Sequence, residues 1–213
     1  MTVPEFPVYV FDVDGTLVDS AADICGAIQG VLASTRRPDV EFKFLTTYIG
    51  RHLIDLFRDL EFSAEETDAL ITQYRRAYPE RNHANTRVYP GVKEALRWLP
   101  GRKATATTRG TPTTRAVLEL FELLPYFDHV QGTDGFPAKP EPDVILTALK
   151  ALGAGPEDCL FVGDSAADME AGRRAGVKTC AVTYGYGVRP EMEMWSPDFW
   201  IDDLRLLCVV EAR

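Results

Sequence analysis

Short runs of apolar, β-branched and aromatic residues alternate with helical patterns along most of this chain of 213 residues. This alternation favours a parallel sheet, because a strand can run parallel to its neighbour only after a crossover connection, usually a helix. We therefore predict an α/β fold with a parallel sheet. The predicted strands are residues 8–11, 104–107, 129–132, 160–163, 179–183 and 199–201, and the predicted helices are residues 92–99, 112–124, 143–152 and 166–175.

One connection in this pattern is far longer than the rest and has no clear strand pattern. Ser63 and Glu66 form a capping box that opens a helix running toward Tyr78, and residues 53–60 predict a further helix. Because a structureless loop of such length is rare inside a domain, we expect a helical insert.

The insert begins soon after the first strand and ends before the next predicted helix. We place it at residues 19–87, so that residues 1–18 and 88–213 form the core. An insert hinged at this point is positioned to act as a lid over the end of the first strand.

Two carboxylates follow the first predicted strand directly. Asp12 and Asp14 are two residues apart, so in an extended chain they face the same way, and Gly15 lets the chain turn sharply after them. Their repulsion must be offset by a cation or by a proton, and both are devices of phosphoryl-transfer chemistry. A strand followed by an ordinary Asp-Gly turn explains the same residues equally well.

Polar residues at or after the ends of other predicted strands distinguish between these two explanations. Ligands in open parallel sheets bind beyond the carboxyl ends of the strands, where Thr107, Lys139 and Asp164 would meet the paired aspartates. Each residue alone has a structural explanation, as a helix cap, a solvated side chain or a first-turn acid. Their occurrence together, in this order, predicts a catalytic site, with Asp168 one helical turn after Asp164.

Composition limits the partners of such a site. The formal net charge of −9 argues against a broad nucleic-acid footprint or an anionic membrane surface, since both require excess Lys and Arg. The 4 cysteines are scattered without C-x-x-C spacing, which favours reduced thiols. No run of apolar residues is long enough to span a membrane and no signal sequence is evident, so we expect a cytoplasmic protein.

These motifs resemble those of the haloacid dehalogenase superfamily, and within it the phosphoglycolate phosphatase group. The residues that carry the resemblance are the segment from Asp12 to Ser20, Thr107, the segment from Lys139 to Pro142, and Gly163-Asp164-Ser165 with Asp168. The resemblance implies a Rossmann-like core of three layers with a helical cap domain in place of the insert. Thr108 and Arg109 depart from it, because close relatives often carry Asn-Lys at these positions.

The resemblance also implies roles. Asp12 would be the nucleophile, and Asp14 would carry the proton to the leaving group and from water. Mg²⁺ would be held by Asp12, Asp164 and the main-chain carbonyl of Asp14, with Asp168 as an outer ligand. Thr107 and Lys139 would bind phosphoryl oxygens.

Substrate choice is expected to come from the cap. Thr108, which follows Thr107, is expected to bind the substrate as well. Gly50 and Arg51 lie in the loop expected to face the site, where Arg51 would clamp a carboxylate, although a solvated surface Arg is an equal alternative. We expect a magnesium-dependent phosphatase acting on a small phosphorylated metabolite, with 2-phosphoglycolate as the best candidate, in a monomer or homodimer. The alternatives are a sugar-phosphate phosphatase, a pyrophosphatase, a β-phosphoglucomutase-like enzyme, or a non-catalytic protein that binds phosphorylated ligands.

Overall fold

A five-stranded parallel sheet forms the centre of the structure, a computed structural model that describes residues 2–208. All pairings within this sheet are parallel, so the carboxyl ends of its strands meet at one edge, as predicted. The strands lie in the order β4 (Arg102–Thr105), β1 (Val8–Phe11), β5 (Cys159–Gly163), β6 (Lys178–Val182) and β7 (Phe199–Ile201).

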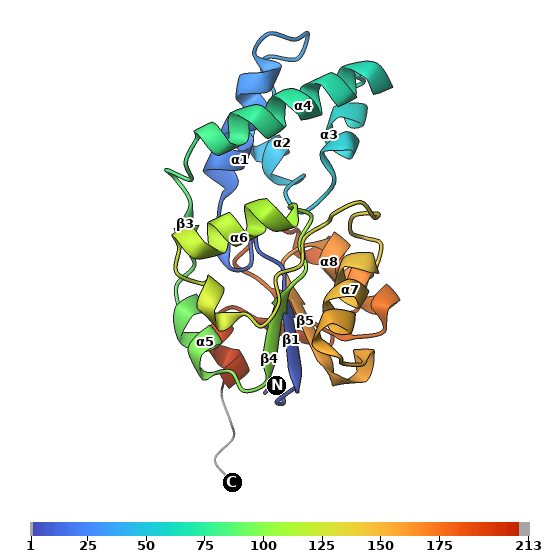
Figure 1. The fold of residues 1–213 in the computed structure, drawn as a ribbon. Helices are drawn as coiled ribbons and strands as arrows, with labels where there is room; N and C mark the ends of the chain where they lie inside the picture. The colour runs from blue at the N-terminus through green and yellow to red at the C-terminus, as the bar shows by residue number, and fades with distance from the viewer. Residues whose placement is uncertain (1, 209–213) are drawn as a thin grey trace.

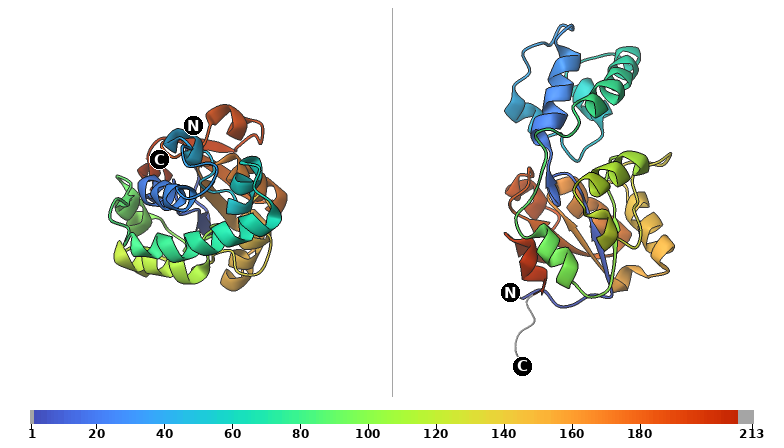
Figure 2. Two further views of the ribbon diagram at one scale, coloured as in Figure 1. Left: turned by 90° about the horizontal axis from the view of Figure 1, so that it is seen from above. Right: turned by 60° about the vertical axis from the view of Figure 1, so that its left-hand side comes forward.

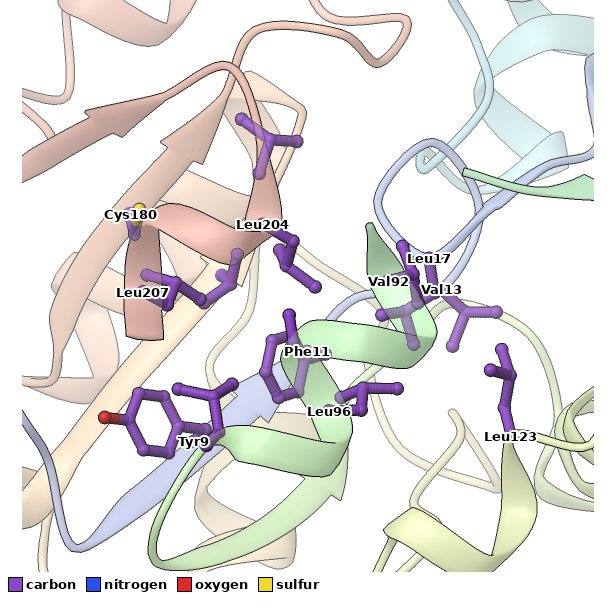
Figure 3. Close-up of a cluster of buried hydrophobic side chains, with 14 of the residues drawn as sticks. Tyr9, Phe11, Val13, Leu17, Val92, Leu96, Leu123, Cys180, Leu204 and Leu207 are labelled. Carbon is purple, nitrogen blue, oxygen red and sulfur yellow. The ribbon is translucent and has the colours of Figure 1, made fainter. Parts of the chain in front are cut away.

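Helices cover both faces of the sheet, which gives the core three layers (Figure 1). Successive side chains of a strand point to opposite faces, so Tyr9 and Phe11 pack on one face and Val8 and Val10 on the other. Figure 3 shows Tyr9 and Phe11 beside side chains of the first face, among them Leu96. That face is covered by α5 (Val92–Trp98) and α6 (Thr111–Leu120), and the second by α7 (Asp143–Leu152) and α8 (Ala166–Ala175).

Helices α1 to α4 form a separate group beyond the carboxyl ends of the strands (Figure 1). Their apolar faces bury a hydrophobic cluster of their own, which includes Ile28, Leu45 and Phe57. Both halves of the predicted capping box at Ser63 and Glu66 are present, and the helix predicted over residues 53–60 is confirmed as α3. The bounds are α1 Ala21–Leu32, α2 Phe42–Thr46, α3 Leu53–Asp59 and α4 Ala64–Glu80.

Two short strands join this helical group to the core. Strand β2 (Val18–Asp19) pairs antiparallel with β3 (Arg87–Val88), and the N–H of Tyr89 donates to the carbonyl oxygen of Leu17 at 3.1 Å. Figure 2 shows the two connecting segments side by side below the helices. Our prediction missed this pair, because two residues are too few to show a strand period.

Residues 129–132 were wrongly predicted to form a strand. They form only isolated bridges within the described chain, one of them between Ala104 and His129. The hydroxyl of Thr105 accepts the N–H of Gln131 at 2.9 Å and donates to its carbonyl oxygen at 3.0 Å. A side chain therefore takes the place of a main-chain partner, which interrupts the ladder at its centre.

Other element boundaries differ from the prediction by a few residues. The strand expected at 104–107 ends at Thr105, so Thr107 follows the strand. Helix α6 ends at Leu120, short of the predicted residue 124, because Glu122 has a positive φ of 58° and ends the helical path. The remaining elements are the 3₁₀ turns Leu124–Tyr126, Pro156–Asp158 and Leu204–Cys208 and the short helix α9 (Arg189–Glu193).

Candidate active site

Three buried carboxylates converge beyond the ends of β1 and β5. Asp12 follows β1, Asp164 follows β5, and Asp168 lies in the first turn of α8. One oxygen from each side chain lies within 4.8 Å of the other two. The parallel sheet thus brings together residues that the sequence places far apart, as predicted.

Lys139 lies between two of these carboxylates and is fully buried. Its Nζ donates to Oδ1 of Asp12 at 2.7 Å, to Oδ1 of Asp168 at 2.5 Å and to the carbonyl oxygen of Ala106 at 3.2 Å. Burial alone would lower the pKa of Lys139, but the charges of Asp12 and Asp168 raise it above its ordinary value. The side chain is therefore a fixed ammonium group next to Asp12.

The carboxylates carry more negative charge than Lys139 can balance. Burial, with the charges of Asp168 and Asp14, raises the pKa of Asp12 to about 7 even though Lys139 opposes the shift. Burial and the charges of Asp168 and Asp12 also raise the pKa of Asp164 well above its usual range. Oδ2 of Asp12 is buried and has no hydrogen-bond partner among the described residues. An all-oxygen group with excess charge and an unpaired oxygen fits a divalent cation.

The turn after β1 holds Asp164 closely. The φ of Gly15 is +93°, and a Cβ atom there would lie 2.3 Å from Oδ2 of Asp164, so a larger residue does not fit. The hydroxyl of Thr16 donates to Oδ1 of Asp164 at 3.2 Å, and the N–H of Tyr186 donates to Oδ2 at 2.8 Å. These contacts orient Asp164 toward the other carboxylates.

Asp14 has different partners from Asp12. Arg109 donates from Nε to Oδ2 at 3.1 Å and from Nη2 to Oδ1 at 2.6 Å, and the Ser20 hydroxyl donates to Oδ1 at 2.5 Å. Burial alone would raise the pKa of Asp14, but the charge and hydrogen bonds of Arg109 and the bond from Ser20 lower it below its ordinary value. The two aspartates that begin this motif therefore have opposite pKa shifts.

Arg109 also contacts the helical group. Its Nη2 donates to the hydroxyl of Tyr78 on α4 at 2.8 Å, and its guanidinium lies 5.0 Å from the centre of that ring. Our site prediction omitted Arg109, Ser20 and Tyr78. The only signal in the sequence was that Thr108 and Arg109 replace the Asn-Lys of the resemblance. The partners of Arg109 could be found only from the three-dimensional structure.

The predicted phosphate-binding threonines lie on the loop that follows β4. Thr107 is buried, its hydroxyl accepts the N–H of Arg109 at 3.4 Å, and its carbonyl oxygen accepts the hydroxyl of Thr133 at 2.9 Å. Thr108 is half-buried and lines a cavity between the helical group and the core. Thr107 is therefore fixed in the core, and Thr108 faces the cavity.

This cavity has a volume of about 520 Å³ and reaches Asp14 and Arg109. Gly50 and Arg51 line it from the helical group, together with apolar and aromatic side chains such as Tyr74. Arg51 is 41% exposed, and its Nη2 lies 3.3 Å from Oε2 of Glu191, with which it forms an ion pair. The predicted cap residues are thus at the cavity wall, but in this structure the Arg51 charge is paired with the core.

The motif order, the carboxylate cluster and the parallel core together define the class of protein. The chain belongs to the haloacid dehalogenase-like hydrolase family, whose family model matches residues 9–182. It is 36% identical over 217 aligned positions to phosphoglycolate phosphatase 1 of Pseudomonas aeruginosa. This alignment covers 95% of this chain and 79% of that protein. It is 34% identical to the phosphoglycolate phosphatase of Aquifex aeolicus, with 90% of each chain covered.

Solved structures agree with these relatives. A predicted phosphoglycolate phosphatase from Haemophilus somnus matches with a TM-score of 0.82 and 28% identity, over 94% of this chain and 96% of that one. A predicted phosphatase from Clostridium acetobutylicum matches with a TM-score of 0.89 and 26% identity, over 96% of this chain and 97% of that one. The chain is a phosphoric monoester hydrolase of the phosphoglycolate phosphatase-like group. Among the described residues, no helix is both long and apolar enough to span a bilayer.

Proposed function

We propose that this chain is a Mg²⁺-dependent phosphatase that hydrolyses a small phosphate monoester through an aspartyl-phosphate on Asp12, with 2-phosphoglycolate as its first candidate substrate. The unpaired Oδ2 of Asp12 beside the Lys139 ammonium carries this proposal. The names of the relatives support the choice of substrate.

Asp12 is the nucleophile in this proposal. Lys139 holds its Oδ1, so the carboxylate is oriented before attack on phosphorus. The same ammonium group can neutralise phosphoryl oxygens as charge develops in the transition state, and the Thr107 hydroxyl can donate to one of them.

Asp14 is the proton carrier. It would take up a proton as the substrate binds, because Arg109 and Ser20 lower its pKa in this structure, and donate that proton to the departing oxygen in the first step. In the second step it would accept a proton from the attacking water. Ser20 and Arg109 hold both of its oxygens, so its position is fixed before substrate arrives.

The side chains of Asp12 and Asp164, with the main-chain carbonyl of Asp14, are the residues that would hold Mg²⁺. When bound, Mg²⁺ would offset the charge of the carboxylates and of the phosphoryl group. Asp168 fits an outer position, because Lys139 engages its Oδ1 and Ser165 engages its Oδ2.

Residues 19–87 would act as a cap domain on a core formed by residues 1–18 and 88–213. The β2 and β3 pair is the hinge in this arrangement, and Gly50, Arg51 and Thr108 line the substrate cavity. The separate hydrophobic cluster of the helical group supports this division.

Measurement of phosphate release across a panel of small phosphorylated metabolites tests the proposal. The panel includes 2-phosphoglycolate, hexose phosphates and pyrophosphate, and we expect 2-phosphoglycolate to give the highest kcat/KM. Asp12→Asn should abolish release from all of them. Turnover retained in Asp12→Asn would exclude the covalent mechanism, and preference for a hexose phosphate or pyrophosphate would replace the substrate.

A further inference from the structure

Arg109 lines the cavity, and its side chain has one pair of donors, on Nη1, that make no hydrogen bond to the described residues. Its side chain is 8% exposed, and its Nε and Nη2 make all of its hydrogen bonds in the described part of the chain, to Asp14 and to Tyr78. Nη1 donates no hydrogen bond to the described residues. It is not fully enclosed by them either, so it remains accessible. Since Arg109 lines the cavity, Nη1 is the part of the guanidinium that a ligand can reach.

The position of Arg109 relates it to the leaving group of the substrate. Under the proposed function, the leaving oxygen lies within hydrogen-bond reach of Asp14, whose two oxygens Arg109 holds. In 2-phosphoglycolate a single methylene group separates that oxygen from the carboxylate. A carboxylate at this distance can bind Nη1 while Nε and Nη2 keep their bonds to Asp14.

The other cavity arginines are less suited to this task. Arg51 is 41% exposed and paired with Glu191, and Arg75 is an exposed residue of α4. Solvent weakens the attraction of both for an anion, whereas Arg109 is buried against the Tyr78 ring, which excludes water.

We infer that Arg109 is the specificity-determining residue of this enzyme, and that its Nη1 binds an anionic group one carbon away from the leaving oxygen. This inference rests on the proposed function. It moves recognition of the substrate carboxylate from Arg51 in the helical group to Arg109 in the core. The class of substrate that it selects is a phosphate monoester whose leaving group carries a carboxylate close to the ester oxygen.

The test compares 2-phosphoglycolate with 2-hydroxyethyl phosphate, in which a neutral hydroxymethyl group replaces the carboxylate. The quantity measured is the ratio of the two kcat/KM values, because disturbance of Asp14 lowers both values and cancels in the ratio. We expect Arg109→Met to lower this ratio about tenfold to a hundredfold, the value of a hydrogen bond to a charged group. Arg58→Met, which removes an exposed arginine of α3, should keep the wild-type ratio.

A second measurement separates this inference from the proposed function. Calorimetry in the Asp12→Asn background gives the affinities of both compounds without turnover, so the affinity ratio is decisive even for a protein that releases no phosphate. Absence of phosphate release from the wild type would reject the proposed function. Equal affinities of Asp12→Asn, with Arg109 intact, for the two compounds would reject the role of Arg109.

Two further variants complete the design. Arg51→Met tests the rival residue, and a fall in the ratio with Arg51→Met but not with Arg109→Met would overturn the inference. Arg109→Lys replaces Arg109→Met if the latter does not fold, because it retains the charge but not the fork. We expect Arg109→Lys to lower the ratio about tenfold, and an unchanged ratio in this folded variant would also overturn the inference.

Discussion

The main-chain N–H of Tyr186 donates a hydrogen bond of 2.8 Å to Oδ2 of Asp164. The hydroxyl of the same tyrosine accepts the N–H groups of Ser20 at 2.7 Å and Ala21 at 3.0 Å, and donates to Oδ1 of Asp19 at 2.8 Å. One residue thus joins a candidate metal ligand to the segment that leads from β2 into α1. Because Ser20 also holds Asp14, this connection reaches both sides of the site.

Tyr186→Phe should therefore lower the free energy of unfolding by about 1–3 kcal/mol, since it leaves two main-chain N–H groups at the start of α1 without an acceptor. Urea titration followed by circular dichroism measures the change. Tyr126→Phe is the matched control, because the Tyr126 hydroxyl makes no hydrogen bond within the described residues and its loss should cost little. An equal loss of stability in both variants would contradict the prediction.

Binding of Mg²⁺ should raise the stability of the protein measurably in the absence of substrate. We expect Mg²⁺ to stabilise the metal-free protein by about 2.7 kcal/mol at a concentration one hundred times its dissociation constant, because the cation binds only the folded carboxylate cluster. Thermal unfolding with and without a chelator measures this effect. Asp164→Asn should abolish it, while Asp158→Asn, a change just before β5, should retain it.

The same variants test the charge balance of the site. Asp164→Asn should not destabilise the metal-free protein at pH 8, because burial and the charges of Asp168 and Asp12 already disfavour its ionised form. A Mg²⁺-induced stabilisation that persists in Asp164→Asn would exclude this carboxylate as a ligand.

We expect the free energy of unfolding to depend on pH in the acid range because of Asp23 on α1. It is fully buried and accepts hydrogen bonds from the N–H of Asn85 at 2.9 Å and from the Thr86 hydroxyl at 2.8 Å. Burial alone would raise its pKa, but the bonds from Asn85 and Thr86 and the charge of Arg81 lower it. Asp23→Asn should lower the free energy of unfolding at pH 7 by about 2 kcal/mol, and the exposed control Asp39→Asn should not.

The folded-state pKa of Asp23 is depressed, so the unfolded chain takes up the proton first as pH falls. The stabilisation is therefore complete above about pH 4, the ordinary aspartate pKa, and is lost as pH falls through the folded-state value. Denaturant titrations between pH 7 and pH 3 should show the difference between wild type and Asp23→Asn shrinking at the acid end. A difference that stays constant over this range would contradict the assignment.

Most of the core and the carboxylate cluster at the edge of its sheet could be predicted from the sequence, because the signals are local. A buried strand has an apolar run, a helix has a capping residue, and Asp12, Lys139 and Asp164 each follow or lie near such an element. Parallel topology then brings the strand ends together without further information. The strand predicted at residues 129–132 was wrong, because the main chain there bonds to the Thr105 side chain, which no local pattern reports.

The sequence by itself determined the class of fold, the helical insert and the carboxylates at the ends of the strands, since these depend on residue type and on short-range spacing. Only the tertiary structure decided which side chains pair around the site. It pairs Asp14 with Arg109, and Arg109 with Tyr78, and it engages Arg51 with Glu191. Such contacts join residues far apart in the chain, and their geometry follows from how the helical group sits on the sheet edge.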